Sequence, residues 1–429
     1  MFPDLRVWRA TLKPAVRKKR QFETVHSLAL LAFAAVLILP AIPAVAEDWP
    51  AYRHDNRRSG VTGELLNPAA LKAAWTYQAP FPPEQAWHGP AKWDAYAEHN
   101  NLRSMRNYDP AYFTIAVGDA VYFGSSAEDA VFCLDAATGA VRWCFVSGGP
   151  VRMAPSYAGG VLYFGSDDGV AYALDAATGK IVWKYRPGEA RLVPSDGKFI
   201  SRWPIRTGVL VDSGKAYFGA ALLPWTTSYL CAVDTSTGKD EGAGLFRKTI
   251  EGVTLEGALL ASPDRLYVPQ GRTRPLVFSR SDGSDLGVVE NAGGVFALLT
   301  AEHEIAFTAP KQKEDYIALQ GADKLATFKD AWCLVVSGDT AYVLRDADLT
   351  AVQRKTGDNL WTVPCDCPYT LILAGDVLFA GGRDKVIAFS TKDGARLAEL
   401  AVKGRAHGLT AANGCLLVST DTGEIHVFR

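Results

Sequence analysis

The sequence predicts an all-β fold built from eight repeats of one four-stranded unit, and three observations support this prediction. Short apolar runs such as Val161-Leu-Tyr-Phe-Gly165 recur eight times between residue 120 and the C-terminus. Most of these runs lead into a second strand that ends in a tight turn. The last unit has no room for a fourth strand before Arg429, while the strand-like segment Leu71–Tyr77 precedes the first unit without a partner.

The best copy of the repeated turn runs from Tyr172 to Trp183 and reads YALDAATGKIVW. Asp175 can accept hydrogen bonds from backbone N–H groups a few residues further on, and Gly179 can adopt a positive φ without a Cβ clash. Trp183 is large and apolar, and its indole N–H needs a partner when it is buried. A hairpin of this size cannot bury itself, so its repetition predicts a stacked or closed array.

The eight apolar runs start near residues 120, 161, 215, 265, 304, 340, 377 and 415. A spacing of roughly 40–50 residues with four strands a unit is typical of a β-propeller, in which neighbouring blades cover each strand on both faces. Leu71–Tyr77 carries Trp75 where other units carry their Trp, so we expect it to complete the last blade. Joining the two ends of the chain in this way removes an open sheet edge. The sequence therefore predicts an eight-bladed β-propeller of four-stranded blades, closed by an N-terminal strand.

Residues 1–46 have the pattern of a secretory signal peptide. The basic stretch Arg17–Arg20 precedes an apolar run, Leu28–Leu39, and the small residues Ala44-Val-Ala46 follow. An uncleaved membrane anchor is the alternative, but two prolines follow the short apolar run. We therefore expect residues 1–46 to be removed and residues 47–429 to form a single propeller in the periplasm or outside the cell.

The charge of the chain is close to balanced, with 45 basic and 46 acidic side chains. Residues 1–46 hold seven of the basic and two of the acidic ones, so the processed chain would carry a formal charge of −6. Neither value suggests nucleic-acid binding, which usually needs a basic surface. Because residue 47 is Glu, the cleavage site offers no cysteine for a lipid anchor. We expect a monomer without a stable membrane anchor.

Two segments depart from the repeats. Glu47–Gly60 is polar and rich in Arg, and we expect it to be irregular. Residues 79–110 form a long insertion rich in Trp, Pro, His and Arg. A loop of that length without secondary structure of its own is usually functional or disordered.

Seven cysteines are spread along the chain: Cys133, Cys144, Cys231, Cys333, Cys365, Cys367 and Cys415. Export would permit disulfides, although a chain of this length can build a core without them. Cys133 and Cys144 flank one copy of the hairpin, and one possibility is that they face each other across it. Cys365-Asp366-Cys367 is compatible with a strained bridge, a metal pair or two buried thiols. An odd count leaves at least one thiol free within the chain, and no zinc-site spacing is present.

The pattern Ala-x-Asp-x-x-Thr-Gly-x-x-x-Trp resembles the tryptophan-docking repeat of the quinoprotein propellers. Residues 173–183 match it in full, residues 133–143 match except for Cys133, and residues 351–361 match except for Gln353. The chain from 47 to 429 is similar to the PQQ-binding-like β-propeller repeat proteins. Further stretches are similar to an exported bacterial subfamily of unknown activity: Asp48-Trp-Pro, Arg58-Ser-Gly60, Pro90–Tyr96, Arg103–Asp109, Gly149–Pro155 and Ile200–Gly208.

Two branches of this family imply different functions. The quinoprotein alcohol dehydrogenases hold pyrroloquinoline quinone (PQQ) between a Trp and a vicinal disulfide, beside a Ca²⁺ ion. This sequence has no Cys-Cys dipeptide, and the ligand set for the metal cannot be placed on it. The second branch is the outer-membrane assembly lipoprotein, a non-catalytic scaffold whose lipid-modified cysteine is absent here. No metal ligand is assigned from the sequence.

The residues that could bind a ligand lie where the chain departs from the repeat. Candidates in or just before the first strands of blades are Arg152, Arg202, Trp203, Arg206, Thr207 and His407. Candidates in the insertion are Trp87, His88, Lys92, Trp93, Asp94, Arg103 and Arg106. Arg offers a planar fork for carboxylates and Trp a stacking face, so several of them on one axis would suit an anionic aromatic ligand. The alternative is structural, with Arg bonding loop carbonyls and Trp filling the ring.

Other conspicuous residues are interpreted as scaffold because they repeat. These are the turn residues Asp135, Asp175 and Asp234 and the blade-docking residues Trp75, Trp143, Trp183 and Trp361. The function that the sequence favours is an exported, non-catalytic propeller that binds a protein partner or a small anionic ligand at the face covered by residues 79–110. The alternative is an oxidoreductase that uses PQQ and Ca²⁺.

Overall fold

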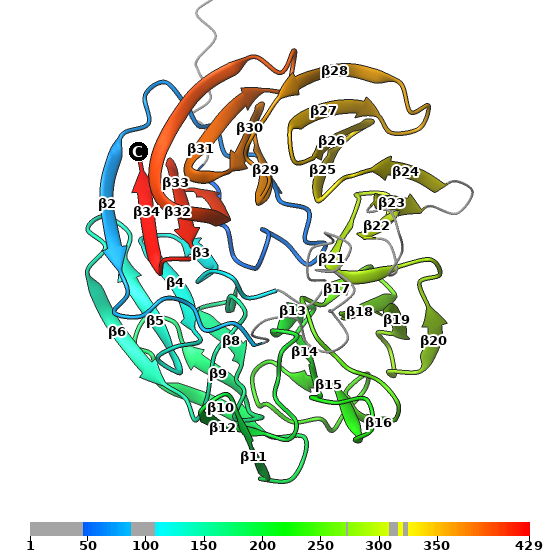
Figure 1. The fold of residues 1–429 in the computed structure, drawn as a ribbon. Helices are drawn as coiled ribbons and strands as arrows, with labels where there is room; N and C mark the ends of the chain where they lie inside the picture. The colour runs from blue at the N-terminus through cyan, green and yellow to red at the C-terminus, as the bar shows by residue number, and fades with distance from the viewer. Residues whose placement is uncertain (1–45, 87–107, 272, 309–315, 321–324) are drawn as a thin grey trace, which may run out of the picture. The chain divides into compact units, whose positions relative to one another are not determined.

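A computed structural model describes residues 46–86, 108–271, 273–308, 316–320 and 325–429, and the ordered elements in these ranges are all β-strands. None of the described residues belongs to a helix that could cross a membrane. The strands all belong to one compact unit, Ala44–Arg429. In Figure 1 the sheets of this unit follow one another around a common centre.

Six sheets have four antiparallel strands each, and consecutive strands pair within them. The first two contain β3 (Thr114–Val117), β4 (Ala120–Ser125), β5 (Ala130–Asp135) and β6 (Val141–Val146), then β7 (Ser156–Ala158), β8 (Val161–Gly165), β9 (Ala171–Asp175) and β10 (Ile181–Tyr185). The next two contain β13 (Leu210–Asp212), β14 (Lys215–Ala220), β15 (Ser228–Asp234) and β16 (Phe246–Ile250), then β17 (Leu260–Ala261), β18 (Arg265–Gln270), β19 (Thr273–Ser279) and β20 (Asp285–Val288). The last two contain β21 (Gly293–Leu299), β22 (Ile305–Thr308), β23 (Tyr316–Gln320) and β24 (Leu325–Lys329), then β25 (Cys333–Ser337), β26 (Thr340–Leu344), β27 (Asp348–Gln353) and β28 (Asn359–Pro364).

A larger sheet joins both ends of the described chain. Its strands are β1 (Val61–Thr62), β29 (Thr370–Ala374), β30 (Val377–Gly381), β31 (Arg383–Ser390), β32 (Arg396–Ala412), β33 (Cys415–Thr420), β34 (Glu424–Phe428) and β2 (Ala73–Gln78). The long strand β32 pairs with β31 over its first half and with β33 over its second half. The predicted N-terminal strand pairs antiparallel with the last strand, with Thr76 opposite His426. The two-residue strand β1, which the sequence did not predict, pairs parallel with β29.

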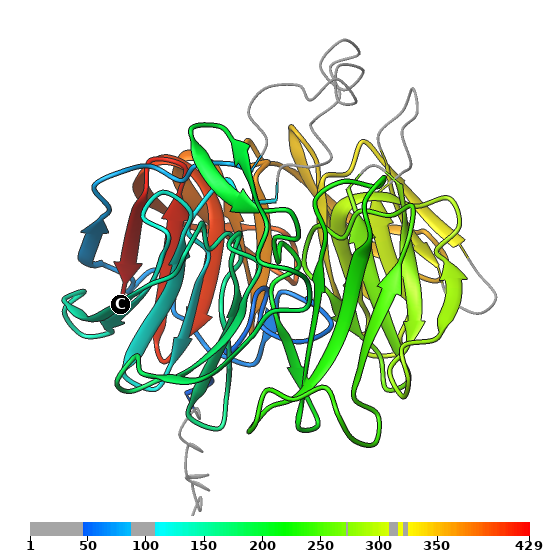
Figure 2. The same cartoon turned by 90° about the horizontal axis from the view of Figure 1, so that it is seen from below.

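One hairpin lies outside the repeats. β11 (Leu192–Ser195) and β12 (Lys198–Ser201) form a two-stranded sheet in the connection between β10 and β13. In Figure 2 it is the green hairpin that rises beyond the ends of the blades. This hairpin was not predicted from the sequence, and each of its strands has only four residues.

The centre of the ring is filled by residues 47–64, called here the axial segment. Trp49 exchanges both backbone hydrogen bonds with Ala116 of β3, at 2.8 and 3.1 Å. Further bonds join the segment to the strands that start the other sheets. They run from Tyr157 N to Pro50 O, Asn56 Nδ2 to Val211 O, Ala261 N to Asn56 O, Leu299 N to Arg57 O, Arg53 Nη2 to Leu334 O, Leu373 N to Gly60 O and Asn413 N to Glu47 O.

These bonds reach the first strand of every four-stranded sheet, and they reach the large sheet at β29 and just after β32. Glu47–Gly60 is irregular, as expected, and strand β1 follows it, but the polar sequence did not predict the burial of the segment. Trp49, Arg58 and Ser59 are less than a tenth exposed. In Figure 1 it is the dark blue chain that crosses the middle of the ring.

Neighbouring sheets are fastened by the Trp residues of their fourth strands. Four indole Nε1 atoms each donate to a carbonyl in the turn of the next sheet: Trp75 to Ala136 at 3.0 Å, Trp143 to Ala176 at 3.1 Å, Trp183 to Thr235 at 2.8 Å and Trp361 to Thr391 at 3.0 Å. Each ring also covers a turn glycine so closely that a Cβ there would lie 2.5–2.7 Å from it, for example at Gly238 beneath Trp183. In the third sheet, whose fourth strand carries no Trp, Phe246 packs over Gly283 in the same way.

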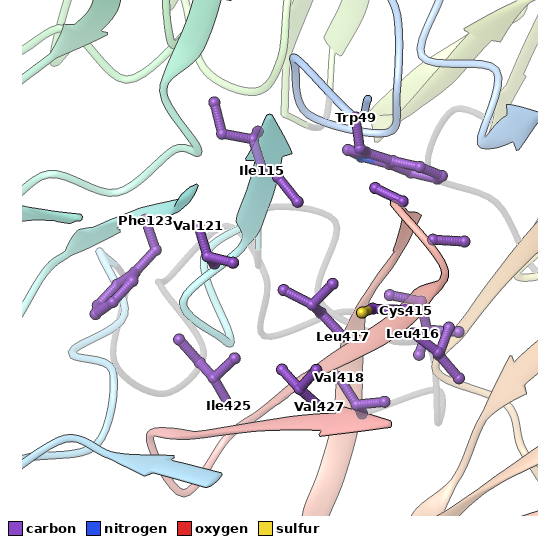
Figure 3. Packing of buried hydrophobic residues seen from close by; sticks show 14 of the residues in the cluster. Trp49, Ile115, Val121, Phe123, Cys415, Leu416, Leu417, Val418, Ile425 and Val427 are labelled. Carbon is purple, nitrogen blue, oxygen red and sulfur yellow. The ribbon is translucent and has the colours of Figure 1, made fainter. Parts of the chain in front are cut away.

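The first and last sheets share the largest hydrophobic core, shown in Figure 3. Ile115, Val121 and Phe123 come from the first sheet and meet Leu417 and Val427 of the last two strands. Trp49 of the axial segment packs against the same cluster and is 1% exposed. This core therefore joins the beginning, the first repeat and the end of the described chain.

The cysteines are all free thiols in this structure. The possibility that Cys133 and Cys144 face each other is wrong. Cys133 pairs with Trp143, and Cys144 pairs with Phe132, so the two thiols are one register step apart. Because successive residues of a strand point to opposite faces, one thiol is buried and the other exposed.

Replacing Trp183 by Ala should lower the free energy of unfolding by about 3 kcal/mol, because it removes a large buried side chain between two sheets. Trp183→Phe keeps most of the packing but removes the closer of the two donors to Thr235 O and leaves only the Tyr163 hydroxyl at 3.3 Å, so we expect a loss of about 1 kcal/mol. Urea unfolding followed by circular dichroism measures both. Trp225→Ala is the control, because Trp225 is 67% exposed. A loss as large for Trp225 as for Trp183 would contradict the docking role.

Candidate functional site

The candidate site lies on the face where the chain passes from one sheet to the next, called here the connecting face. Arg152 lies in the connection from β6 to β7, and Arg206 in the connection from β12 to β13. Asp167 lies in the turn between β8 and β9, and Asp109 lies at the end of the long insertion. These four residues, called here the ionic cluster, are each less than a tenth exposed at the side chain.

The ionic cluster is held by close, charge-assisted hydrogen bonds. Asp167 accepts two hydrogen bonds from Arg206, one from Nε to Oδ1 at 3.0 Å and one from Nη2 to Oδ2 at 2.8 Å. Asp167 also accepts from Arg152 Nε at 2.7 Å, while Arg152 Nη1 donates to Asp109 Oδ2 at 2.8 Å and to Glu84 O at 2.6 Å. Two guanidinium groups are therefore paired with two carboxylates out of contact with water.

The two carboxyl groups respond differently to this environment. Burial raises the pKa of Asp109, and the nearby arginines do not fully offset it. Burial also raises the pKa of Asp167, but Arg152 and Arg206 outweigh that effect and hold it below the ordinary value. Asp167 is therefore the carboxylate on which the two arginines depend.

Tyr108 links the ionic cluster to the centre of the ring. Its ring packs with Met153 and Ala258, and Tyr52 of the axial segment lies against the same group. The side chain is 4% exposed, and its hydroxyl has no hydrogen-bond partner among the described residues. Burial raises the pKa of Tyr108 well above its ordinary value, so the phenol stays neutral.

Two other candidates, Trp203 and Thr207, are buried and make local contacts. Trp203 donates from Nε1 to Thr227 O at 2.6 Å and packs edge-on against Tyr229, while Arg202 lies over its ring. Thr207 Oγ1 accepts from Gly219 N at 2.9 Å. These side chains hold the connection between the second and third units against the third sheet.

His407 lies in β32, beside the axial segment. Its ring is tilted by 48° against that of Tyr369, with 4.9 Å between the ring centroids, and it lines a cavity with Trp49, Tyr52 and Arg53. The volume open to the centre of a water molecule in this cavity is about 30 Å³, whereas one water needs about 10–15 Å³. The described cavity thus has room for a few waters and not for a large cofactor.

The candidates in the insertion lie outside the described residues: Trp87, His88, Lys92, Trp93, Asp94, Arg103 and Arg106. The structure brings Arg152 and Arg206 together and leaves His407 apart from them. Sequence reasoning did not name Asp167, Asp109 or Tyr108 as candidates; Asp167 lies in the turn between β8 and β9. The one available signal was the Asp-Asp pair in that turn, since a turn needs a single Asp.

The ionic cluster and the small cavity beside His407 do not fit PQQ. The cofactor carries three carboxylates, and the two buried guanidinium groups on this face are already paired with Asp167 and Asp109. Cys365 and Cys367 are separate thiols, with the lower pKa at Cys365 because Cys367 donates a hydrogen bond to it. Within the described ranges, no group of three or more His, Cys, Asp or Glu side chains is placed to hold a metal ion.

A family model described as outer membrane protein assembly factor BamB matches residues 93–363. The chain belongs to this family. The family assignment and the sheets together identify a β-propeller of PQQ-like repeats. A search of curated proteins finds no match.

Solved structures share the fold of this BamB-family chain at low sequence identity. A europium-containing methanol dehydrogenase matches with a TM-score of 0.61 and 13% identity, over 89% of this chain and 98% of that one. A quinohemoprotein alcohol dehydrogenase from Pseudomonas putida HK5 matches with a TM-score of 0.57 and 13% identity, over 89% and 80%. The computationally designed protein Ika8 matches with a TM-score of 0.56 and 13% identity, over 75% and 97%. At this identity the likeness concerns the fold alone.

Replacing Asp167 by Asn should destabilise the protein strongly, because Arg152 and Arg206 would stay buried with too little negative charge. Breaking a buried ion pair in this way costs about 3–5 kcal/mol. The matched change Asp109→Asn should cost about 1 kcal/mol, because burial already disfavours the charged form of Asp109. Urea unfolding at pH 7 measures both losses. Equal losses would contradict this, because they would show that the two carboxylates compensate the positive charge of the arginines to the same extent.

Asp109 should also give the protein a specific pH dependence. Its folded pKa lies above the ordinary value of 3.8, so it favours folding below that value and loses this contribution as the pH rises through the folded pKa. Wild-type protein should therefore gain stability relative to Asp109→Asn as the pH falls from 7 to 4. Urea unfolding of both proteins at each pH tests this, and a constant difference between them would contradict it. Asp167 acts in the opposite sense, and its stabilisation is lost only as the pH falls below 3.8.

Proposed function

We propose that this protein is an exported, eight-bladed propeller that acts as a non-catalytic scaffold and binds a protein partner on its connecting face. The observation that carries the proposal is that the chain fills its own axis. Residues 47–64 take the hydrogen-bonding positions along the first strands, where an axial ligand would otherwise lie. The buried arginines of the ionic cluster are paired as well. Binding is then left to the outer surface of the face.

The count of eight blades follows from dividing the large sheet at β32. Its first half is the fourth strand beside β31, and its second half is the first strand beside β33. With the six four-stranded sheets this makes eight units, the last of which is completed by β2. Trp75 of β2 then docks on the first sheet as Trp143 docks on the second. A ring closed in this way has no open first or last edge.

The proposed binding surface is the hairpin of β11 and β12. Pro194 pairs with Phe199, so Phe199 and Leu192 share one side of the hairpin, where they are 68% and 58% exposed. On the other side Ile200 is 1% exposed, and Lys198 bonds to Asp129 at 2.8 Å. The hairpin is thus fixed to the propeller by one face and offers an apolar face to solvent.

A second exposed aromatic residue lies on the same part of the connecting face. Trp225, in the loop between β14 and β15, is 67% exposed. Its loop is tied to the segment after the hairpin by the bond from Trp203 Nε1 to Thr227 O. Exposed aromatic and aliphatic side chains on fixed supports are the typical anchors of protein interfaces. We therefore expect a partner that contributes apolar side chains.

The double variant Leu192→Asp, Phe199→Asp should weaken partner binding at least tenfold while the melting temperature stays unchanged, since both side chains are exposed in the free protein. The partner is identified by photo-crosslinking from position 199 in cells, and its affinity is then measured with purified proteins. Val146→Asp is the matched control, because Val146 is 69% exposed on an outer strand. Equal weakening by the control, or undiminished binding by the double variant, would overturn this surface.

The scaffold proposal also predicts that the purified protein neither takes up PQQ nor oxidises alcohols. Adding PQQ and Ca²⁺ and then removing the excess should leave no bound chromophore in the absorbance spectrum. Dye-linked oxidation of short alcohols should stay at the level of a boiled sample. Stoichiometric uptake of PQQ with turnover would overturn the proposal in favour of a quinoprotein dehydrogenase. Uptake without turnover would instead support a binding protein for a small anionic ligand.

A further inference from the structure

Glu64 is a buried carboxylate for which the described residues supply no positive charge. The residue is 5% exposed. Its Oε1 accepts from the backbone N–H of Gly414 at 2.9 Å, and its Oε2 accepts from the backbone N–H of Glu47 at 2.7 Å. None of the ion pairs in the described ranges includes Glu64. Buried carboxylates are normally paired with a cation, because two neutral donors offset only part of the cost of removing the charge from water.

One of the two donors is the first residue after the predicted cleavage site. The sequence places that site between Ala46 and Glu47, and Ala46 is exposed in the structure. In the uncut chain the nitrogen of Glu47 is a neutral amide with a single hydrogen. In a chain that starts at Glu47, the same nitrogen would be an α-ammonium group with a full positive charge.

We propose that a processing peptidase cuts between Ala46 and Glu47, and that Glu64 binds the new α-ammonium group in a buried ion pair. Hydrolysis breaks the Ala46–Glu47 C–N bond. Water gives its oxygen to the carbonyl carbon of Ala46 and a hydrogen to the nitrogen of Glu47, which takes up a further proton near neutral pH. The nitrogen already lies 2.7 Å from Glu64 Oε2, so pairing needs no movement of the chain.

Other contacts of Glu47 fix the nitrogen in this position. Its carbonyl accepts from Asn413 N at 3.3 Å, and its carboxylate accepts from Thr62 Oγ1 at 2.6 Å and faces His54 Nε2 at 3.4 Å. The charged groups that contact Glu47 or adjoin it in sequence are the carboxylates of Glu64 and Asp48 and the ring of His54, and Arg429 bonds to Cys415 Sγ one residue beyond Gly414. The carboxylate of Glu64 is the charged group in direct contact with the nitrogen, and it favours a cation there. A chain starting a residue earlier or later would not place its ammonium group there.

The first test uses the full 429-residue chain expressed in a bacterium that exports it. Intact mass should show a product that begins at Glu47. Its α-amino group should react with 2-pyridinecarboxaldehyde at pH 7 at least tenfold more slowly than in urea-unfolded protein, because an ammonium group held by Glu64 is buried. A product that begins elsewhere would overturn the proposal, and so would an amine that reacts equally fast in both states.

The second test separates the ion pair from the general effect of changing a buried residue. Two chain lengths are compared, one starting at Glu47 and one retaining Ala44-Val-Ala46, each with Glu64 and with Glu64→Gln. In the chain that starts at Glu47, Glu64→Gln should lower the melting temperature by at least about 3 °C more than it does in the longer chain. Glu424→Gln, at another buried carboxylate that is paired with Lys403, should act equally in both lengths. An equal effect of Glu64→Gln in both lengths would overturn the ion pair.

If Glu64→Gln prevents folding, the labelling rate of the processed wild-type protein still decides the question. Neither test involves the partner surface on hairpin β11–β12, so the outcome is independent of the proposed scaffold function.

Discussion

The backbone hydrogen bonds between the axial segment and the first strands are the constraint on which the rest of this structure depends. A first strand has a neighbour on one edge only, and its other edge would carry unpaired N–H and C=O groups at the centre of the ring. Residues such as Trp49, Asn56 and Gly60 supply partners to these edges, sheet after sheet. The segment thereby ties blades that are far apart around the ring. It also occupies the centre with protein and leaves only a small cavity there, beside Trp49, Tyr52 and Arg53.

The repeated part of the fold could be predicted because its contacts are local and recur. The turn that contains Asp175 and Gly179 has the same physical requirements in each copy, and the Trp that covers the next turn follows at a fixed spacing. The prediction weakened where an insertion shifted that spacing. In the third unit Phe246 covers Gly283 in place of a Trp. Phe246 follows the turn residue Gly238 by eight residues, whereas Trp183 follows Gly179 by four, so the repeat pattern could not assign Phe246 that role.

The remaining features depend on contacts between segments that carry no repeat. The axial segment reads as a polar loop, and only the ring around it explains why Arg58 is buried, with its guanidinium bonded to Leu259 O. The error over Cys133 and Cys144 has a different cause. A bulge beside Cys133 shifts the register by one residue, and a shift of one residue turns every side chain to the opposite face. The spacing of the two cysteines cannot reveal that bulge.

The ionic cluster shows why arginines that stand out in the sequence can have a structural role and need not form an anion-binding site. The sequence suggested Arg152 and Arg206 as ligand-binding candidates, but a guanidinium can serve a ligand only while its carboxylate partner is absent or displaced. Here Asp167 bonds both arginines with its two oxygens, and an anionic ligand would have to separate that buried pair at a cost of several kcal/mol. A protein that docks on the exposed side of hairpin β11–β12 meets no such cost. The same charges that would attract a ligand in an open funnel thus hold the connections of two blades together, and the recognition surface that we propose, on hairpin β11–β12, is apolar instead.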